Sequence, residues 1–165
     1  HLQNALNLEN DNLSLYRRFG YYTSAFGEGW ALYSERLSLE IGLANDPYDE
    51  LGVLQSELFR AVRLVVDTGM HFKRWTREEA MDYMKKKTGM SDTEVTVEIE
   101  RYIVWPGQAC SYKVGMLKIL ELREKAKQEL GENFDIRDFH SAVLDHGEPP
   151  LFIVEELVSE MTNNR

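Results

Sequence analysis

Residues 76–94 read TREEAMDYMKKKTGMSDTE, and this stretch gives the clearest local evidence for the fold. Thr76 with Glu79 three residues later is a capping box, which predicts the start of a helix. Gly89 suits the end of that helix, because glycine adopts the left-handed conformation of a helix cap at no steric cost. The basic residues 85–87 just before it fit the negative end of the helix dipole.

The same boundary patterns recur along the chain and divide it into helices. Ser91 with Glu94 forms a second capping box, and the helix that it opens is expected to end before Pro106. Asp46 before Pro47 is typical of an N-cap followed by proline in the first helical turn. The expected helices cover residues 2–18, 28–41, 47–67, 76–89, 91–105, 107–130, 135–147 and 148 onwards.

Apolar residues at helical spacing support this division, and no stretch alternates strictly enough to predict a strand. Two stripes show the helical spacing: Trp30, Tyr33, Leu37 and Ile41 in one helix, and Leu51, Leu54, Leu58, Ala61 and Val65 in the next. We therefore expect an all-α fold of about eight helices, forming a single domain or a fragment of one.

Composition narrows the classes of function. The 165 residues include 19 Lys and Arg against 28 Asp and Glu, a net charge of −9, so general nucleic-acid binding is not expected. No apolar run approaches the ~20 residues of a membrane span, and the single Cys110 excludes an internal disulfide. The chain starts at His1 with no signal-peptide pattern, so we expect a mature product, a proteolytic fragment or an excised domain.

Residues 26–35, FGEGWALYSE, contain the first cluster that could carry chemistry. Glu28 and Glu35 are two helical turns apart, which places both carboxylates on one face but ~10 Å apart along the axis. One of them could bind a metal ion while the other supports the site or the helix packing. The alternative for Glu28 is a solvated glutamate that the helix dipole favours at a helix start.

A second cluster lies in residues 63–71, where Arg63, Asp67 and His71 recur every four residues. If the helix continues, Asp67 can accept a hydrogen bond from His71 and fix its tautomer. His71 could then donate to a developing oxyanion or bind a substrate. The alternative is a structural histidine at a helix end.

A third cluster lies in residues 101–113, RYIVWPGQACSYK, where a Pro-Gly break separates two helices. Gln108 and Tyr112 are expected to share a helix face and to point at a substrate, near Arg101 and Lys113. The alternative is a helix corner that Trp105 packs, with the polar residues in water.

The remaining histidines do not form a metal motif. His140 and His146 are six residues apart, whereas helical metal pairs are usually four apart. We assign His140 to packing beside Phe139. No H-E-x-x-H motif occurs in the chain.

Together these segments resemble the C-terminal part of the bacterial proteins classed as domain of unknown function 885. Those proteins are similar to helical zinc metallopeptidases such as carboxypeptidase Taq and thimet oligopeptidase. The matching segments occur in family order within residues 1–3, 26–35, 63–71 with Trp75, 101–113 and 139–144.

The resemblance implies a zinc site built on the family motif H-E-x-x-P-G-H. His1 then corresponds to the second histidine of the motif or to a residue just after it, and Glu28 to the carboxylate ligand. Glu35 would support Glu28, and Asp67 would support His71. The remaining implied roles are stabilisation of the oxyanion by His71 or Tyr112 and contact with the substrate by Arg101, Gln108 and Lys113.

Two functions are expected on this basis. The first is the C-terminal part of a zinc-dependent peptidase acting on a peptide or a related amide, inactive as this piece because the H-E-x-x-H segment is missing. The alternative is a non-catalytic helical module that presents a groove to a peptide or protein. A half-domain should expose apolar surface, so self-association is also expected. The compartment stays open, with cytoplasm, periplasm and lipoprotein export all compatible with this bacterial sequence.

Overall fold

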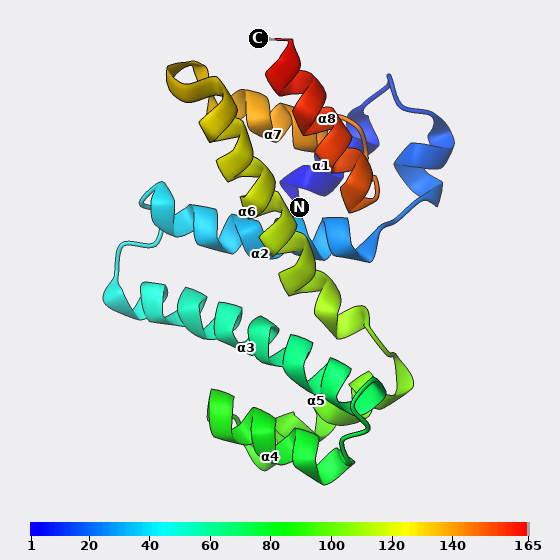
Figure 1. The fold of residues 1–165 in the computed structure, drawn as a ribbon, viewed down its shortest axis with the longest axis vertical. Helices are drawn as coiled ribbons and strands as arrows, with labels where there is room; N and C mark the ends of the chain where they lie inside the picture. The colour runs from blue at the N-terminus through cyan, green and yellow to red at the C-terminus, as the bar shows by residue number, and fades with distance from the viewer. Residues whose placement is uncertain (165) are drawn as a thin grey trace. The chain divides into compact units, whose positions relative to one another are not determined.

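The computed structural model describes residues 1–164, which confirm the expected all-α class (Figure 1). No strand occurs in that range. The described α-helices are α1 (Leu2–Glu9), α2 (Ser24–Glu40), α3 (Pro47–His71), α4 (Arg77–Thr88), α5 (Asp92–Val104), α6 (Ser111–Leu130), α7 (Ile136–Leu144) and α8 (Leu151–Asn163). Shorter turns are a π-helix at Tyr16–Gly20 and 3-10 helices at Gln108–Cys110 and Gly131–Asn133.

The two capping boxes form as predicted. The Glu79 backbone N–H donates to Thr76 Oγ1 at 3.1 Å, and the Thr76 N–H donates to Glu79 Oε2 at 2.7 Å. Ser91 and Glu94 make the same reciprocal pair at the start of α5. Gly89 ends α4 with a φ of +70°, in the left-handed region that favours glycine.

The predicted first helix is too long, because α1 ends at Glu9 rather than near residue 18. Asn10 ends it in an extended conformation and uses its side chain twice. Its Oδ1 accepts from the Asn12 N–H at 3.0 Å, and its Nδ2 donates to the Asp145 carbonyl at 2.9 Å. These bonds give the backbone an alternative to the helix.

Other boundaries also differ from the predictions: α2 begins at Ser24 rather than 28, α7 ends at Leu144 rather than 147, and α8 begins at Leu151 rather than 148. Two more differences affect the candidate site. α6 begins at Ser111 rather than 107, because Gly107 has a φ of +79° and residues 108–110 form a tighter 3-10 turn. α3 continues four residues beyond Asp67, to His71. Gln108 and Tyr112 therefore do not share one α-helix, although Asp67 and His71 do.

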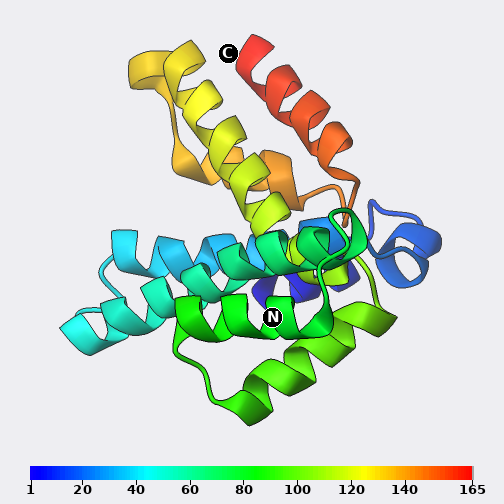
Figure 2. The same cartoon turned by 60° about the horizontal axis from the view of Figure 1, so that its bottom comes forward.

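The chain divides into two compact units, residues 31–114 and residues 1–30 with 115–165. In the first, α4 and α5 lie beside α3 (Figures 1 and 2). Tyr102 is fully buried in the core cluster of this unit. The other buried members are Val62, Val66, Ala80, Met84, Val95, Ile99 and Ala109.

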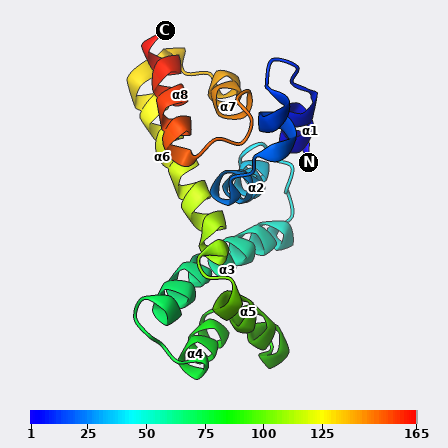
Figure 3. The same cartoon turned by 90° about the vertical axis from the view of Figure 1, so that its right-hand side faces the viewer.

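In the second unit, α7 and α8 pack on each other and α8 lies beside α6 (Figure 3). An ion pair at 2.8 Å joins Lys118 of α6 to Glu155 of α8. Buried apolar side chains of this unit include Phe26, Met116, Ile119, Leu122, Phe139, Val143 and Val154. Among the described residues, no helix combines the length and apolar composition that crossing a membrane demands.

The apolar stripe predicted on α3 is largely exposed. Leu51, Leu54 and Leu58 are 59%, 51% and 47% accessible to solvent. The buried face of α3 carries Val62 and Val66 instead. An apolar stripe on this helix therefore did not identify its core-facing side.

Candidate functional site

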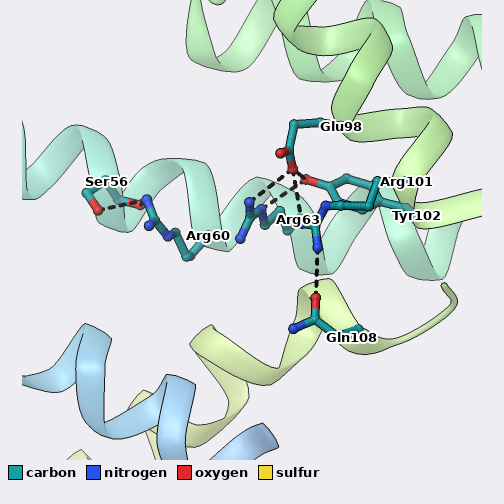
Figure 4. Close-up of polar contacts among 7 residues, drawn as sticks. All are labelled: Ser56, Arg60, Arg63, Glu98, Arg101, Tyr102 and Gln108. Atoms are coloured by element: carbon teal, nitrogen blue, oxygen red, sulfur yellow. Dashed lines mark hydrogen bonds and ion pairs between the residues drawn. The ribbon is translucent and has the colours of Figure 1, made fainter. Parts of the chain in front are cut away.

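A network of charged and phenolic side chains joins α3 to α5 within residues 31–114 (Figure 4). Arg63, which is 6% exposed, donates from Nε to the Tyr102 hydroxyl oxygen at 2.9 Å and from Nη2 to Glu98 Oε2 at 3.0 Å. The Tyr102 hydroxyl donates to the same Glu98 oxygen. The mostly buried Glu98 carboxylate thus accepts hydrogen bonds from both the Arg63 guanidinium and the Tyr102 hydroxyl.

The network shifts the pKa values of its members. Burial raises the pKa of Tyr102 strongly, and the hydrogen bond to Glu98 adds to this, so Tyr102 stays a neutral proton donor. Burial opposes the ionisation of Glu98. The Tyr102 hydrogen bond and the charges of Arg63 and Arg101 nevertheless hold the pKa of Glu98 below its ordinary value.

Arg101 and Gln108, two predicted substrate contacts, are brought together. Arg101 Nη1 donates to Gln108 Oε1 at 2.8 Å, and Arg101 Nη2 donates to Glu98 Oε2 at 3.2 Å. The 3-10 turn after Gly107 gives Gln108 this position. Arg101 therefore links the Arg63–Tyr102–Glu98 network to the Pro-Gly break.

The expected hydrogen bond between Asp67 and His71 is replaced by bonds to the third cluster. Both carboxylate oxygens of the buried Asp67 accept from the Gly107 backbone N–H, at 3.1 and 3.0 Å. His71 Nε2 lies 2.9 Å from the Tyr102 carbonyl oxygen, which can only accept a hydrogen bond. The backbone N–H of Gly107 thus takes the place of His71, on the same helix α3, as the expected hydrogen-bond donor to Asp67.

Tyr112 lies beside two guanidinium groups of α3. The Cζ atoms of Arg60 and Arg63 are 5.6 and 5.1 Å from the centre of its ring. Arg60 also donates from Nη1 to Ser56 Oγ at 2.8 Å (Figure 4). The aromatic ring and the two cations attract each other electrostatically.

Lys113 and Glu35, the other predicted site residues of this unit, have polar partners within it. The buried Lys113 donates to Glu57 Oε1 at 2.5 Å, and Arg36 lies 3.7 Å from that same oxygen. Glu35 Oε2 accepts from Ser56 Oγ at 2.6 Å. Glu35 therefore joins α2 to α3 through a hydrogen bond to Ser56.

Cys110 is a free thiol beside the buried Asp67. Burial raises the pKa of Cys110 to about 11, and the Asp67 carboxylate contributes to the rise. A thiol with that pKa is almost fully protonated at neutral pH and is a poor nucleophile.

Glu28 lies in the other unit, half-buried on α2 between two glycines. Within residues 1–164 its carboxylate makes no hydrogen bond or ion pair. Gly29 permits α2 to approach α6, because a Cβ at Gly29 would lie 2.4 Å from Gly115 Cα. Gly29 beside Glu28 thus lets the backbones of two helices approach, while the Glu28 carboxylate makes no polar contact within the described residues.

Glu148 is a buried carboxylate that connects this part of α2 with α1. It is 6% exposed, its Oε1 accepts from Gln3 Nε2 at 3.0 Å, and its carbonyl accepts from the Thr23 hydroxyl at 2.8 Å. Its Oε2 is buried without a hydrogen-bond partner and would be 3.7 Å from a Cβ at Gly27. The Glu148 carboxyl group therefore bonds to Gln3, two residues after His1, and lies near the backbone of Gly27.

The predicted metal ligands do not by themselves form a metal site. His1 is exposed and precedes the first turn of α1. Within residues 1–164, no three His, Cys, Asp or Glu side chains cluster closely enough to hold a metal ion. His140 packs against the rings of Trp30 and Phe139, at 5.3 and 5.8 Å, as expected.

The sequence patterns do not single out three residues of these clusters: Arg60, Glu98 and Glu148. Glu98 had a detectable pattern, since it lies three and four residues before Arg101 and Tyr102 on one helix. Arg60 and Glu148 had none, because their environments depend on contacts with residues far away in the sequence.

Comparison with known families gives one match. The family described as “Bacterial protein of unknown function (DUF885)” matches residues 1–158. A comparison with functionally curated proteins finds no match.

Two solved structures are similar to nearly the whole chain. A “putative lipoprotein” from Colwellia psychrerythraea is 54% identical with a TM-score of 0.96, and the match covers 100% of this chain and 28% of that one. A “putative lipoprotein of unknown function” from Shewanella oneidensis is 29% identical with a TM-score of 0.87, covering 96% of this chain and 29% of that one. The chain thus spans less than a third of the length of either relative.

Proposed function

The chain belongs to this bacterial DUF885 family, and we propose that it is the part of a zinc-dependent peptidase that supplies Glu28 as a metal ligand. The proposed substrate is a peptide or a related amide. The residues proposed to contact that substrate are Arg101, Gln108 and Lys113.

The observation that carries the proposal is the position of Glu148. It contacts Gln3 through Oε1 and lies beside Gly27 through Oε2, so one buried group joins the two segments that resemble the metal-binding part of zinc peptidases. Glu28, which follows Gly27 in the chain, is half-buried and has no hydrogen-bond donor in residues 1–164. A carboxylate without a donor or cation of its own has both oxygens available to bind a metal ion.

The donor set of the described residues is incomplete for zinc. Catalytic zinc has about three protein ligands, whereas residues 1–164 offer at most Glu28 and His1. The proposal therefore assigns the missing ligands to parts of the protein that the structure does not describe.

Of the two candidates for stabilising an oxyanion, Tyr112 is better suited than His71. His71 Nε2 must donate to the Tyr102 carbonyl, so a neutral His71 has only an acceptor left at Nδ1. A phenolic hydroxyl such as that of Tyr112 is a hydrogen-bond donor of the kind that an oxyanion needs. Tyr112 also lies beside the positive charges of Arg60 and Arg63, which favour a nearby anion.

The test uses the full-length protein with Glu28→Gln. Loss of a charged metal ligand should lower both the bound zinc and the rate of peptide cleavage by about 100-fold or more. Zinc is measured by mass spectrometry of the purified protein, and cleavage with a mixed peptide library with and without a chelator.

Glu9→Gln is the matched control, because Glu9 is an exposed glutamate at the C-terminal end of α1. It should leave both quantities unchanged. Equal zinc content and activity in the Glu28→Gln variant and the parent would contradict the proposal. Peptide binding without zinc and without cleavage would instead support the non-catalytic helical module.

Two further features extend the proposal beyond the site. The lipoprotein description of both solved relatives supports an exported location for this protein. The exposed leucines of α3 support self-association of the chain.

A further inference from the structure

Arg60 and Arg63 on α3 form a pair of guanidinium groups with unused hydrogen-bond donors, and we propose that this pair binds a carboxylate group of a small organic ligand. The two residues are three apart on one helix and therefore share a face. The inference rests on this cluster alone and does not depend on zinc or on peptidase activity.

The strongest evidence is buried nitrogen atoms that lack a partner. Arg63 uses Nε and Nη2 on Tyr102 and Glu98, but its Nη1 is buried without a hydrogen bond. The Nε of Arg60 is likewise buried without a hydrogen bond. Unpaired buried donors of charged groups are costly, so a ligand that accepts from them gains that energy on binding.

Arg60 also lacks a counter-ion among residues 1–164. Its hydrogen bonds go to the hydroxyl and carbonyl oxygens of Ser56, which are neutral (Figure 4). Two neighbouring cations repel each other unless an anion lies near both. Arg63 has Glu98, but Glu98 is shared with Arg101.

The local charge therefore has the opposite sign to that of the chain. Arg60, Arg63 and Arg101 carry three positive charges against the two negative charges of Glu98 and of Glu35, which the Ser56 hydroxyl links to Arg60, and this leaves +1. The whole chain carries −9. A positive cluster in an acidic protein attracts small anions selectively to that place.

The surroundings favour a carboxylate over a phosphate. Both guanidinium groups lie over the rings of Phe59, at 5.3 and 4.2 Å, and of Tyr112, at 5.6 and 5.1 Å. Such rings contact an organic group attached to the anion, whereas free phosphate offers nothing to contact them. The planar guanidinium fork matches the two oxygens of a carboxylate. Arg60 is half-buried and Arg63 buried, so Arg60 is the more accessible of the two guanidinium groups.

The test measures binding of 3-phenylpropanoate to the full-length protein by isothermal titration calorimetry at low ionic strength. The matched probes are 3-phenylpropanamide, which has the same shape without the charge, and inorganic phosphate. We expect the carboxylate to bind at least about 10-fold more tightly than the amide, as the loss of one charge-assisted hydrogen bond predicts. Binding of phosphate in preference to the carboxylate would overturn the proposal.

Variants assign the binding to the pair. Arg60→Gln and Arg63→Gln should each weaken carboxylate binding by about 10-fold or more, while Arg77→Gln, at a partly exposed arginine on α4, should leave it unchanged. Arg63 is buried and its variant can fail to fold, in which case Arg60→Gln decides, because the half-buried Arg60 bonds only to Ser56. Equal affinity of Arg60→Gln and the parent, or no binding by the parent, would overturn the proposal.

Discussion

Glu98 is the residue on which the polar contacts between α3 and α5 converge. Its Oε2 accepts from Arg63, Arg101 and Tyr102. Glu98→Gln removes the charge that compensates a buried guanidinium. We expect the free energy of unfolding to fall by about 1–3 kcal/mol at pH 7. Urea unfolding followed by circular dichroism measures it.

The pH dependence gives the sharper test of Glu98. Its pKa in the folded protein lies below the ordinary value of 4.5, so its stabilising effect is present above pH 4.5 and is lost as the pH falls through the lower folded value. The difference between parent and Glu98→Gln should therefore shrink at acidic pH. Glu132→Gln, at an exposed glutamate, should show no such pH-dependent difference. An equal difference in the free energy of unfolding between parent and Glu98→Gln at pH 7 and at pH 3 would contradict this role of Glu98.

Cys110 gives a second prediction at this scale. Burial and the Asp67 carboxylate raise the pKa of Cys110 to about 11 from an ordinary value of 9.0. At pH 7.5 its thiolate fraction, and hence its rate of alkylation by iodoacetamide, should be about 100-fold below that of a free cysteine. Mass spectrometry follows the reaction, and the chain unfolded in urea serves as the control. If Cys110 in the folded protein reacts as fast as it does in the unfolded chain, its pKa is not raised.

At the scale of elements, the contact between α2 and α6 depends on glycine. A Cβ at Gly115 would lie 1.8 Å from the Ala25 carbonyl oxygen, which is backbone and cannot rotate away. Gly115→Ala should therefore destabilise the protein by about 3 kcal/mol or more, measured by thermal or urea unfolding. Gly52→Ala is the matched helical control, since nothing lies within 4 Å of a Cβ there. It should stabilise α3 by about 0.5–1 kcal/mol. Equal stabilisation by both substitutions would contradict the close approach.

Which elements the sequence could predict depends on how far apart the deciding atoms lie. Capping boxes at Thr76 and Ser91 use atoms within three residues, and both helix starts are correct. The end of α1 depends on a hydrogen bond from Asn10 to Asp145, 135 residues away, and was placed wrongly. The site follows the same rule. Segments 63–71 and 101–113 were identified separately, but their contacts through Gly107 and Tyr102 required the fold.

At the scale of the whole molecule, net charge and apolar surface act against each other. The charge of −9 repels copies of the chain, whereas Leu51, Leu54 and Leu58 expose an apolar stripe on α3. Burying such side chains is worth about 1.5–3 kcal/mol each, more than screened charge repulsion between exposed groups costs. Self-association should therefore occur and should strengthen with salt, since salt weakens only the repulsion.

Sedimentation velocity of the chain of residues 1–165 tests this prediction. The weight-average mass should exceed that of a monomer and should rise between 50 and 500 mM NaCl. Over this range the Debye length falls from about 14 Å to about 4 Å, which screens the repulsion between copies. Leu54→Lys places a charge in the stripe and should shift the mass toward the monomer. Gln55→Lys adds the same charge to the same helix at an exposed polar position and should have little effect. A monomer at every salt concentration, or equal effects of the two lysines, would show that the stripe does not drive association.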